Sequence, residues 1–303
     1  MPGNPNYPNT ILHIRGSGND GANLFTDLSP APKSVVAHGA ARSVAGGNPF
    51  DSSGTSLLLD GGSGTGLGVA DHADFHFGAS VPFCIQSWVK LLAAPSIEAT
   101  LWGRGVYGVN SDYYLLVNSE RKAFVYLGSS ASTLVGATPI TLGSWTHVAL
   151  TRDDAHVLRL FINGVKDAQA TTTASTESNA TGEYIVGADS ALAYMRLFAN
   201  VFDLHIARGV SVYTDNFTPP SAPIPNWMGQ VGGVVRDAAN VPCARTVRLI
   251  NRSSSALLAE GVSDASTGVY LLNSPTLSEC QRIVLDDSAG TLENDLIDRV
   301  FPG

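Results

Sequence analysis

The sequence is poor in cysteine, with three among 303 residues. Cys84, Cys243 and Cys280 are odd in number and widely spaced, so they lack the close pairs by which cysteines hold a metal ion. We expect three reduced, inert thiols in a protein made in a cytoplasm. Spacing alone does not decide whether Cys243 and Cys280 form a bridge.

Charge is also scarce, and basic charge most of all. Charged residues are 15% of the chain, and 18 basic against 26 acidic side chains give a net charge of −8. That balance gives no reason to expect nucleic acid or an anionic membrane as a partner. An apolar run of about 18 residues, long enough for a membrane-spanning helix, does not occur. The first residues lack a basic stretch followed by an apolar core, so no secretory signal is predicted.

A third deficit is helical periodicity, because no segment of about 15 residues repeats its apolar positions at the helical spacing. The chain has 31 glycines and abundant Ser and Thr, which favour short strands and many turns. The predicted fold class is therefore all-β, with less than about 10% helix. The length suits one large domain and one small domain.

Residues 143–167 show the clearest strand pattern. Alternate residues from Leu158 to Ile162 are apolar, and Trp145 opens the apolar run before them. Asn163-Gly164 then suits a tight hairpin turn, because both residues tolerate positive φ. The segment predicts three antiparallel strands that need a second sheet to cover them.

The residues from Trp145 to Gly164 resemble the central hairpin of the laminin-G-like, concanavalin-A-like jelly-roll domains. Three more stretches resemble strands of that family in the same order: Ser56–Gly61, Pro82–Lys90 and Phe202–Val210. The resemblance implies a large concanavalin-A-like jelly-roll sandwich. From the strand pattern, Trp88 and Trp145 are expected to be largely buried. The continuation from Tyr213 to Pro220 resembles the version of this domain found in bacteriophage structural proteins.

A different pattern follows the proline-rich residues 219–230. Val231–Pro242 and Asp264–Tyr270 resemble the opening strand and a hairpin of the carboxypeptidase-regulatory-like (transthyretin-like) fold, which implies a small seven-stranded β-sandwich. Pro30–Gly47 is expected to hold one short edge strand at most. The predicted parts are an extended N-terminal arm at 1–10, the jelly roll at 11–225, a linker at 226–230 and the small sandwich at 231–303.

Glycanases share the jelly-roll fold, and a glycanase needs a specific pair of catalytic carboxyl groups. Those enzymes place two carboxyl groups about 5 to 9 Å apart, but the seven glutamates here are scattered, with no Glu-x-Asp-x-x-Glu pattern. Ser144 lacks the Gly-x-Ser-x-Gly elbow of a nucleophile. His72 and His76 are four residues apart in a stretch that is loop-like rather than helical, which favours a surface pair over a metal site. The sequence predicts no catalytic and no metal-binding residue, and no enzymatic activity.

Two kinds of ligand stay open. A structural calcium ion is possible, because the family often binds calcium through loop aspartates, and the loop-side candidates are Asp60, Asp71, Asp74, Asp112 and Asp189. No other cofactor is expected. Carbohydrate or partner contact is possible through aromatic residues near predicted loops, since such rings stack on sugar faces; the candidates are Trp102, Tyr107, Tyr113 and Tyr194. For Trp102 and Tyr113 the alternative is a place in the core.

The predicted function is that of a non-enzymatic bacteriophage virion protein, such as a decoration, collar or tail-associated component. It would be made in the bacterial cytoplasm, packed against other virion proteins and present as a homo-oligomer in the particle. The alternative is a receptor-binding or adhesion module that recognises a host surface glycan or protein. The two differ in their surfaces, since packing would cover the N-terminal arm and the small domain, whereas an adhesin needs a free rim.

Overall fold

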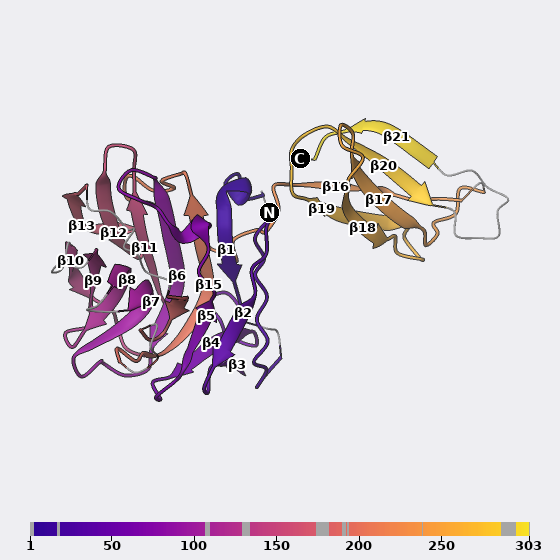
Figure 1. Cartoon of the computed structure of the whole chain (residues 1–303). Coiled ribbons are helices and arrows are strands. Elements are labelled where there is room, and N and C mark those ends of the chain that lie inside the picture. The colour runs from indigo at the N-terminus through magenta and orange to yellow at the C-terminus, as the bar shows by residue number, and fades with distance from the viewer. Residues whose placement is uncertain are drawn as a thin grey trace. The chain divides into compact units, whose positions relative to one another are not determined.

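The computed structural model describes residues 3–302 apart from 17–18, 107–109, 129–133, 174–181, 190–191, 193, 238 and 286–294. The fold class is confirmed, since strands make up 49% and helices 2% of the chain. The chain forms two compact units, Asn9–Ile224 and a smaller one that joins Met1–Pro8 to Pro225–Gly303 (Figure 1). No helix in the described part is both long and apolar enough to cross a membrane.

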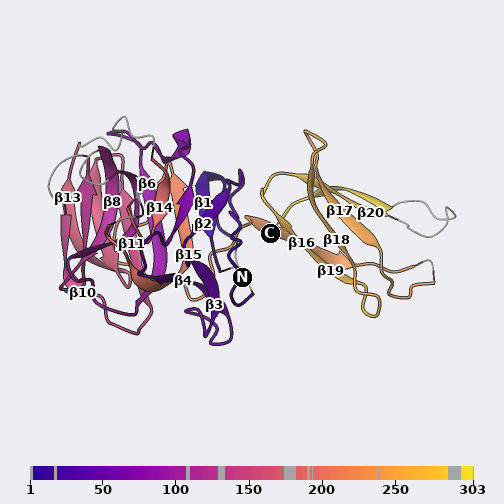
Figure 2. The ribbon, with the colours of Figure 1, turned by 60° about the horizontal axis from the view of Figure 1, so that its bottom comes forward.

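The larger unit is a sandwich of two antiparallel sheets, seen from two directions in Figures 1 and 2. One has eight strands in the order β13 (Val165–Thr171), β12 (Val157–Ile162), β11 (Thr146–Arg152), β6 (Phe83–Leu91), β15 (Phe198–Arg208), β4 (Thr55–Asp60) and β3 (Arg42–Ala45), with β1 (Thr10–Ile14) paired to β15. The other has seven: β10 (Leu134–Pro139), β9 (Lys122–Leu127), β8 (Asn110–Asn118), β7 (Glu98–Val106), β14 (Tyr184–Val186), β5 (Gly66–Val69) and β2 (Val35–His38). Two single-turn 3-10 helices are described, η1 (Tyr7–Asn9) and η2 (Ala73–Phe75).

The core lies between the two sheets. Alternate residues of the central strand β6, such as Phe83 and Ile85, are fully buried against inward residues of β8, such as Leu115 and Val117. A core made from one face of each sheet is the arrangement that a sandwich requires. The core therefore accounts for one face of each strand and leaves the opposite face to carry other residues.

The hairpin predicted at residues 143–167 is confirmed. Strand β11 pairs with β12, and β12 pairs with β13 across a turn in which Asn163 has φ of 50° and Gly164 has φ of 76°. Gly164 is needed for a second reason, because a Cβ atom there would overlap the backbone carbonyl oxygen of Phe217. The turn and a distant segment of the chain thus meet at this glycine.

One open edge of the sandwich is closed by a side chain. The Asp167 carboxylate on β13 accepts hydrogen bonds from the backbone N–H groups of Ala137 (2.9 Å) and Thr138 (3.0 Å) on β10. Strands β13 and β10 are the outermost strands of their sheets on this side. One carboxylate therefore links the two sheets where no further strand does so in the described chain.

Several expectations need correction. Residues 30–47 contain two strands, β2 and β3, rather than one at most. Residues 1–10 are not simply an extended arm, because η1 and the start of β1 fall within them and the Asn4 N–H donates to the carbonyl of Trp227. The residues predicted as a linker, 226–230, lie within the second segment of the smaller unit, which runs from Pro225 to Gly303, and β16 begins among them at Gly229.

The two tryptophans expected in the core are only partly buried. Trp88 and Trp145 are both of intermediate exposure, on the face of the eight-stranded sheet away from the core or at its margin. The Lys90 ammonium lies 5.3 Å from the ring centroid of Trp145. Alternation explains the error for Trp88, because it shares a face with Gln86 rather than with Ile85.

The smaller unit contains six strands among its described residues. The pair β16 (Gly229–Val234) and β19 (Val269–Ser274) forms one sheet, and β18 (Leu257–Val262), β17 (Thr246–Asn251), β20 (Cys280–Leu285) and β21 (Asp295–Val300) form a second sheet that packs against it. Its core includes Val247, Leu249, Tyr270 and Leu272. Its likeness to a seven-stranded transthyretin-like sandwich stays a prediction. The three cysteines of the chain are free, with Cys84 and Cys280 buried.

Candidate binding site

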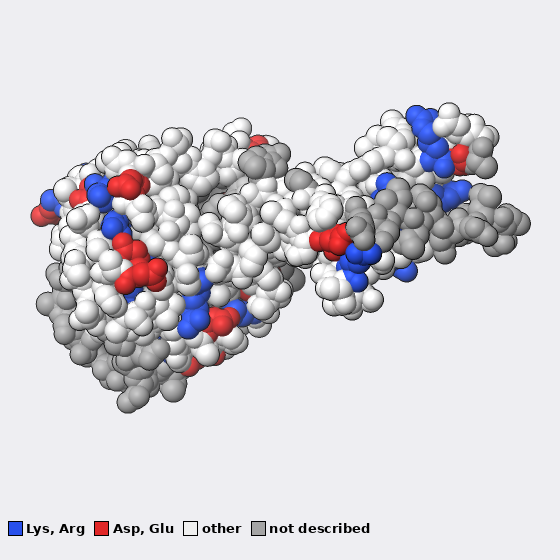
Figure 3. Space-filling view, turned by 90° about the horizontal axis from the view of Figure 1, so that it is seen from above, with Lys and Arg blue, Asp and Glu red and all other residues white. Residues whose placement is uncertain are grey.

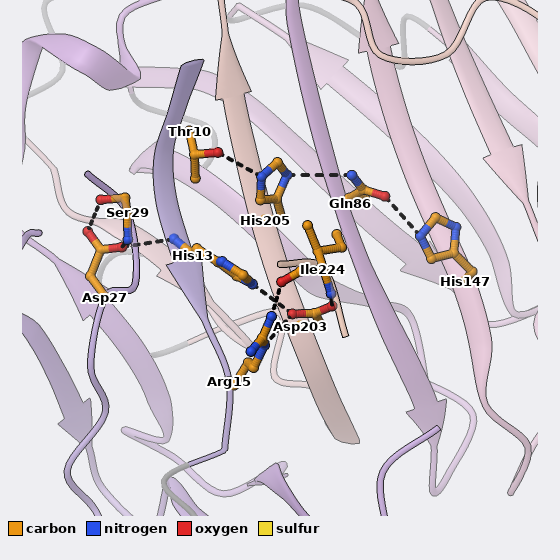
Figure 4. Close-up of polar contacts among 10 residues, drawn as sticks. All are labelled: Thr10, His13, Arg15, Asp27, Ser29, Gln86, His147, Asp203, His205 and Ile224. Atoms are coloured by element: carbon orange, nitrogen blue, oxygen red, sulfur yellow. Dashed lines mark hydrogen bonds and ion pairs between the residues drawn. The ribbon is translucent and has the colours of Figure 1, made fainter. Parts of the chain in front are cut away.

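A buried polar cluster lies on the face of the eight-stranded sheet away from the core (Figure 4). Gln86 on β6 lies between two histidines: its Oε1 is 3.1 Å from His147 Nε2 and its Nε2 is 3.5 Å from His205 Nδ1. These side chains alternate along their strands with core residues such as Ile85 and Ile206. All three are at most 2% exposed, so something covers them.

Residues of β1 contact His205, and the segment of residues 211–224, called the strap below, covers Gln86 and His147. Tyr213 of the strap donates its hydroxyl to Gln86 Oε1 at 2.9 Å, and its ring stacks on Phe217 with centroids 3.6 Å apart. At the other end the Ile224 N–H donates to Asp203 Oδ2 at 2.7 Å. The strap is thus anchored at both ends to polar groups that the sheet presents.

Asp203 contacts three further residues of this cluster, His13, Arg15 and Ile224. His13 Nε2 lies 2.7 Å and Arg15 Nε lies 2.8 Å from Asp203 Oδ1, and Arg15 also donates to the carbonyl of Ile224 (Figure 4). Burial by itself would raise the pKa of Asp203, but the hydrogen bond and charge of His13 and the charge of Arg15 hold it below its ordinary value. Asp203 therefore stays ionised and neutralised in place.

The two histidines beside Gln86 are held neutral. Burial lowers the pKa of His147 to about 4, and burial together with the charge of His13 lowers the pKa of His205 to about 3. Thr10 Oγ1 lies 2.9 Å from His205 Nε2, which is the spacing of a nucleophile and its base. Because His205 is so weak a base and both residues are at most 4% exposed, we assign this pair a structural role.

A different region presents accessible groups, at the rim where β4, β7, β14 and β15 have their ends. A hollow of about 510 Å³ opens there, a size that suits a small ligand. The hollow is lined by Gly61, Pro95, Ser96, Ile97, Glu98, Asp189, Tyr194, Met195 and Arg196. We call it the rim pocket. Two large side chains on it are strongly exposed, Ile97 at 75% and Tyr194 at 72%.

Tyr194 is exposed but its backbone is held on both sides. Its N–H donates to the Asp189 carboxylate at 3.1 Å, and Asp189 itself is only 2% exposed. The neighbouring Met195 carbonyl accepts from the Thr100 N–H at 2.8 Å, and the Leu192 carbonyl accepts from the Gly64 N–H at 2.9 Å. The ring is therefore presented by a fixed frame.

Two residues of this frame have a backbone conformation that is unfavourable in energy. Leu192 and Met195 have φ of 55° and 56°, in the left-handed region that most residues avoid. Such conformations persist only where surrounding contacts impose them, and they concentrate at binding and catalytic sites. The Met195 side chain supplies one of those contacts, since it packs against the buried cluster of Tyr114, Leu116 and Phe124.

The four aromatic residues predicted to contact a ligand differ in their exposure. Trp102 and Tyr113 are each 1% exposed and belong to the core, so the alternative reading holds for them and neither ring can meet a ligand. Tyr107 lies outside the described residues. Tyr194 alone of the four is both described and exposed. Ile97 and Arg196 were not predicted, because an exposed aliphatic residue and a surface arginine carry no sequence pattern.

Three of the aspartates considered for calcium contact basic side chains within the chain. Asp71 and Asp112 both contact the buried Arg104, at 2.6 Å for Asp71, and Asp74 lies 2.8 Å from Lys33. His72 and His76 flank η2, and His76 Nε2 lies 3.0 Å from Asp71. Within the described ranges no three His, Cys, Asp or Glu side chains are grouped to hold a metal. Calcium stays a prediction with no set of ligands in the described chain.

Residues 60–203 match the concanavalin A-like lectin/glucanases superfamily. Two solved structures with a similar fold are the Trypanosoma rangeli sialidase in complex with sialic acid (15% identity, TM-score 0.51, 68% of this chain and 31% of the sialidase) and the binding domain of Paraclostridial Mosquitocidal Protein 1 (12% identity, TM-score 0.50, 98% and 74%). A third, domain 4 of the Geobacillus stearothermophilus arabinanase AbnA with arabinotriose, has 18% identity and a TM-score of 0.48 over 67% of this chain and 94% of that domain.

The chain spans about a third of the length of the sialidase, and at these identities the likeness shows the fold alone. No curated protein matches the sequence. The larger unit has a concanavalin A-like sandwich fold.

Proposed function

We propose that this protein works by binding and not by catalysis, and that the rim pocket of its larger unit recognises a saccharide. The observation that carries this proposal is Tyr194, an aromatic ring that is 72% exposed over a hollow and held by a hydrogen-bonded frame. An amphipathic ring in such a place stacks on the apolar face of a sugar and leaves its hydroxyl for hydrogen bonding. A fixed frame also means that little conformational entropy is lost on binding.

The first test is the change Tyr194→Ala, read on an array of surface glycans and then by calorimetry on the best binder. We expect binding to fall about tenfold or more, because a central aromatic contact carries a large share of binding energy. Phe301→Ala is the control, since Phe301 is 66% exposed in the smaller unit and so removes an exposed ring elsewhere. Equal binding by both variants, or no binding to any glycan, would contradict the proposal.

We also propose that the protein is part of a bacteriophage particle, as a decoration, collar or tail-associated component made in the bacterial cytoplasm and present in several copies. The resemblance of Tyr213–Pro220 to phage structural proteins motivates this assignment. One surface favours packing: Val234, Val269 and Leu271 on the outward face of β16 and β19 are 49 to 61% exposed. Other virion proteins are the partners that this face would meet.

Particles purified on a density gradient test the assignment by mass spectrometry. We expect this chain among the particle proteins, at a constant ratio to the major capsid protein across gradient fractions. Its absence would remove the virion role and leave a cell-surface or secreted glycan-binding protein as the better description.

A further inference from the structure

The charged residues of the rim pocket differ in their availability. Asp189 is 2% exposed and its carboxylate is occupied by the Tyr194 N–H. Glu98 also takes part in interactions within the chain. Arg196 is exposed, and within the described part of the chain its guanidinium has no hydrogen-bond or ion-pair partner. The pocket therefore offers one uncommitted cation beside its aromatic ring.

A guanidinium is suited to one kind of ligand group. Its planar fork of N–H donors matches a carboxylate through two parallel hydrogen bonds, which are stronger than bonds between neutral groups. Tyr194, two residues away on the same loop, supplies the ring for a sugar face. We infer that the rim pocket binds a saccharide that carries a carboxylate, such as a uronic acid, with Arg196 on the carboxylate and Tyr194 on the ring.

The inference rests on the proposed saccharide site and adds the charge of the ligand. The net charge of the whole chain is −8, so its long-range field does not attract an anion. Recognition would therefore come from contact at Arg196 and not from steering. This distinguishes the site from a basic surface that collects polyanions of any kind.

The experiment compares sugars that differ only at one carbon, which carries a carboxylate in one sugar and a neutral hydroxymethyl group in the other. Dissociation constants of the intact chain are measured by calorimetry for D-galacturonic acid against D-galactose and D-glucuronic acid against D-glucose, with the corresponding oligosaccharides where single sugars bind weakly. We expect the acid of one pair to bind about tenfold tighter or more, as a charge-assisted hydrogen bond predicts. Salt is kept constant because it screens the ion pair.

Three variants complete the design. Arg196→Gln should abolish the preference for the acid while leaving the affinity for the neutral sugar in place. Tyr194→Ala should weaken both sugars of the pair. Lys166→Gln removes the same charge from an exposed position on β13, away from the rim pocket, and should change neither affinity.

The outcomes separate the two proposals. A neutral sugar that binds as tightly as its acid, with loss in Tyr194→Ala, overturns the charge inference and keeps the saccharide site. A preference for the acid that survives Arg196→Gln also overturns it. If the protein binds none of these sugars, or binds an acidic peptide such as poly-glutamate in their place, both proposals fail.

Discussion

Gly164 is a single residue whose replacement should cause a measurable loss of stability. Its φ is positive and a Cβ atom would overlap the Phe217 carbonyl, so Gly164→Ala should lower the free energy of unfolding by about 3 kcal/mol or more. Gly143→Ala is the matched control, because Gly143 also has positive φ, at 71°, but has open space around it. That change should cost about 1 kcal/mol. Urea titrations of both variants would contradict the role of the strap contact if the losses were equal.

The prediction that Trp145 lies in the core was wrong. Its sequence context indicates a core residue whose truncation to alanine costs about 3 to 5 kcal/mol. In the structure it is half-buried, with Lys90 beside its ring. Because part of that surface is already in contact with water, we expect Trp145→Ala to cost about 1 to 2 kcal/mol, again by urea titration. A loss above about 3 kcal/mol would restore the core reading.

At the scale of elements, the packing of the strap over β6, β11 and β15 makes stability depend on pH. His147 and His205 are neutral in the folded protein, with pKa values lowered to about 4 and about 3, whereas in the unfolded chain their pKa is about 6.5. Below about pH 6.5 the unfolded chain therefore binds more protons, so the free energy of unfolding falls as the pH falls. Each histidine contributes at most about 1.4 kcal/mol per pH unit.

The measurement is a set of urea titrations between pH 7.5 and 4.5. His147→Gln should reduce the slope of stability against pH by up to about 1.4 kcal/mol per unit. An unaltered slope in His147→Gln would mean that this histidine is not held neutral by burial.

The sequence patterns predicted the positions of the strands better than they predicted which side chains the fold brings together or leaves accessible. The β11 to β13 hairpin follows from alternation and an Asn-Gly turn, which are local properties. The polar cluster around Gln86 could not be predicted, because it depends on β1, β6, β11 and β15 meeting and on the strap returning over them. Tyr194 was a candidate from its loop position, whereas the availability of Arg196 depends on contacts that only the fold decides.

At the scale of the whole molecule, the smaller unit is discontinuous in sequence. The Asn4 N–H donates to Trp227 just before β16 begins. Deletion of residues 1–8 should therefore speed hydrogen exchange in peptides from residues 225–235, while peptides from β6 and β11 keep the rate of the intact chain. Mass spectrometry of exchanging peptides reads both units in one sample. Unchanged exchange near Trp227 would show that the N-terminal residues contribute nothing to this unit.

The hydrogen bonds between Asp167 and β10 affect whether another copy of the protein can add a strand at this edge. Outer strands with unpaired backbone groups are templates on which another chain adds a strand, and growth of this kind leads to fibrils. Here the N–H groups of Ala137 and Thr138 on β10 are already taken by a carboxylate, and a charged group sits where an incoming strand would pair. A strand added at this edge would therefore find two of the N–H donors of β10 already occupied, which disfavours strand addition there.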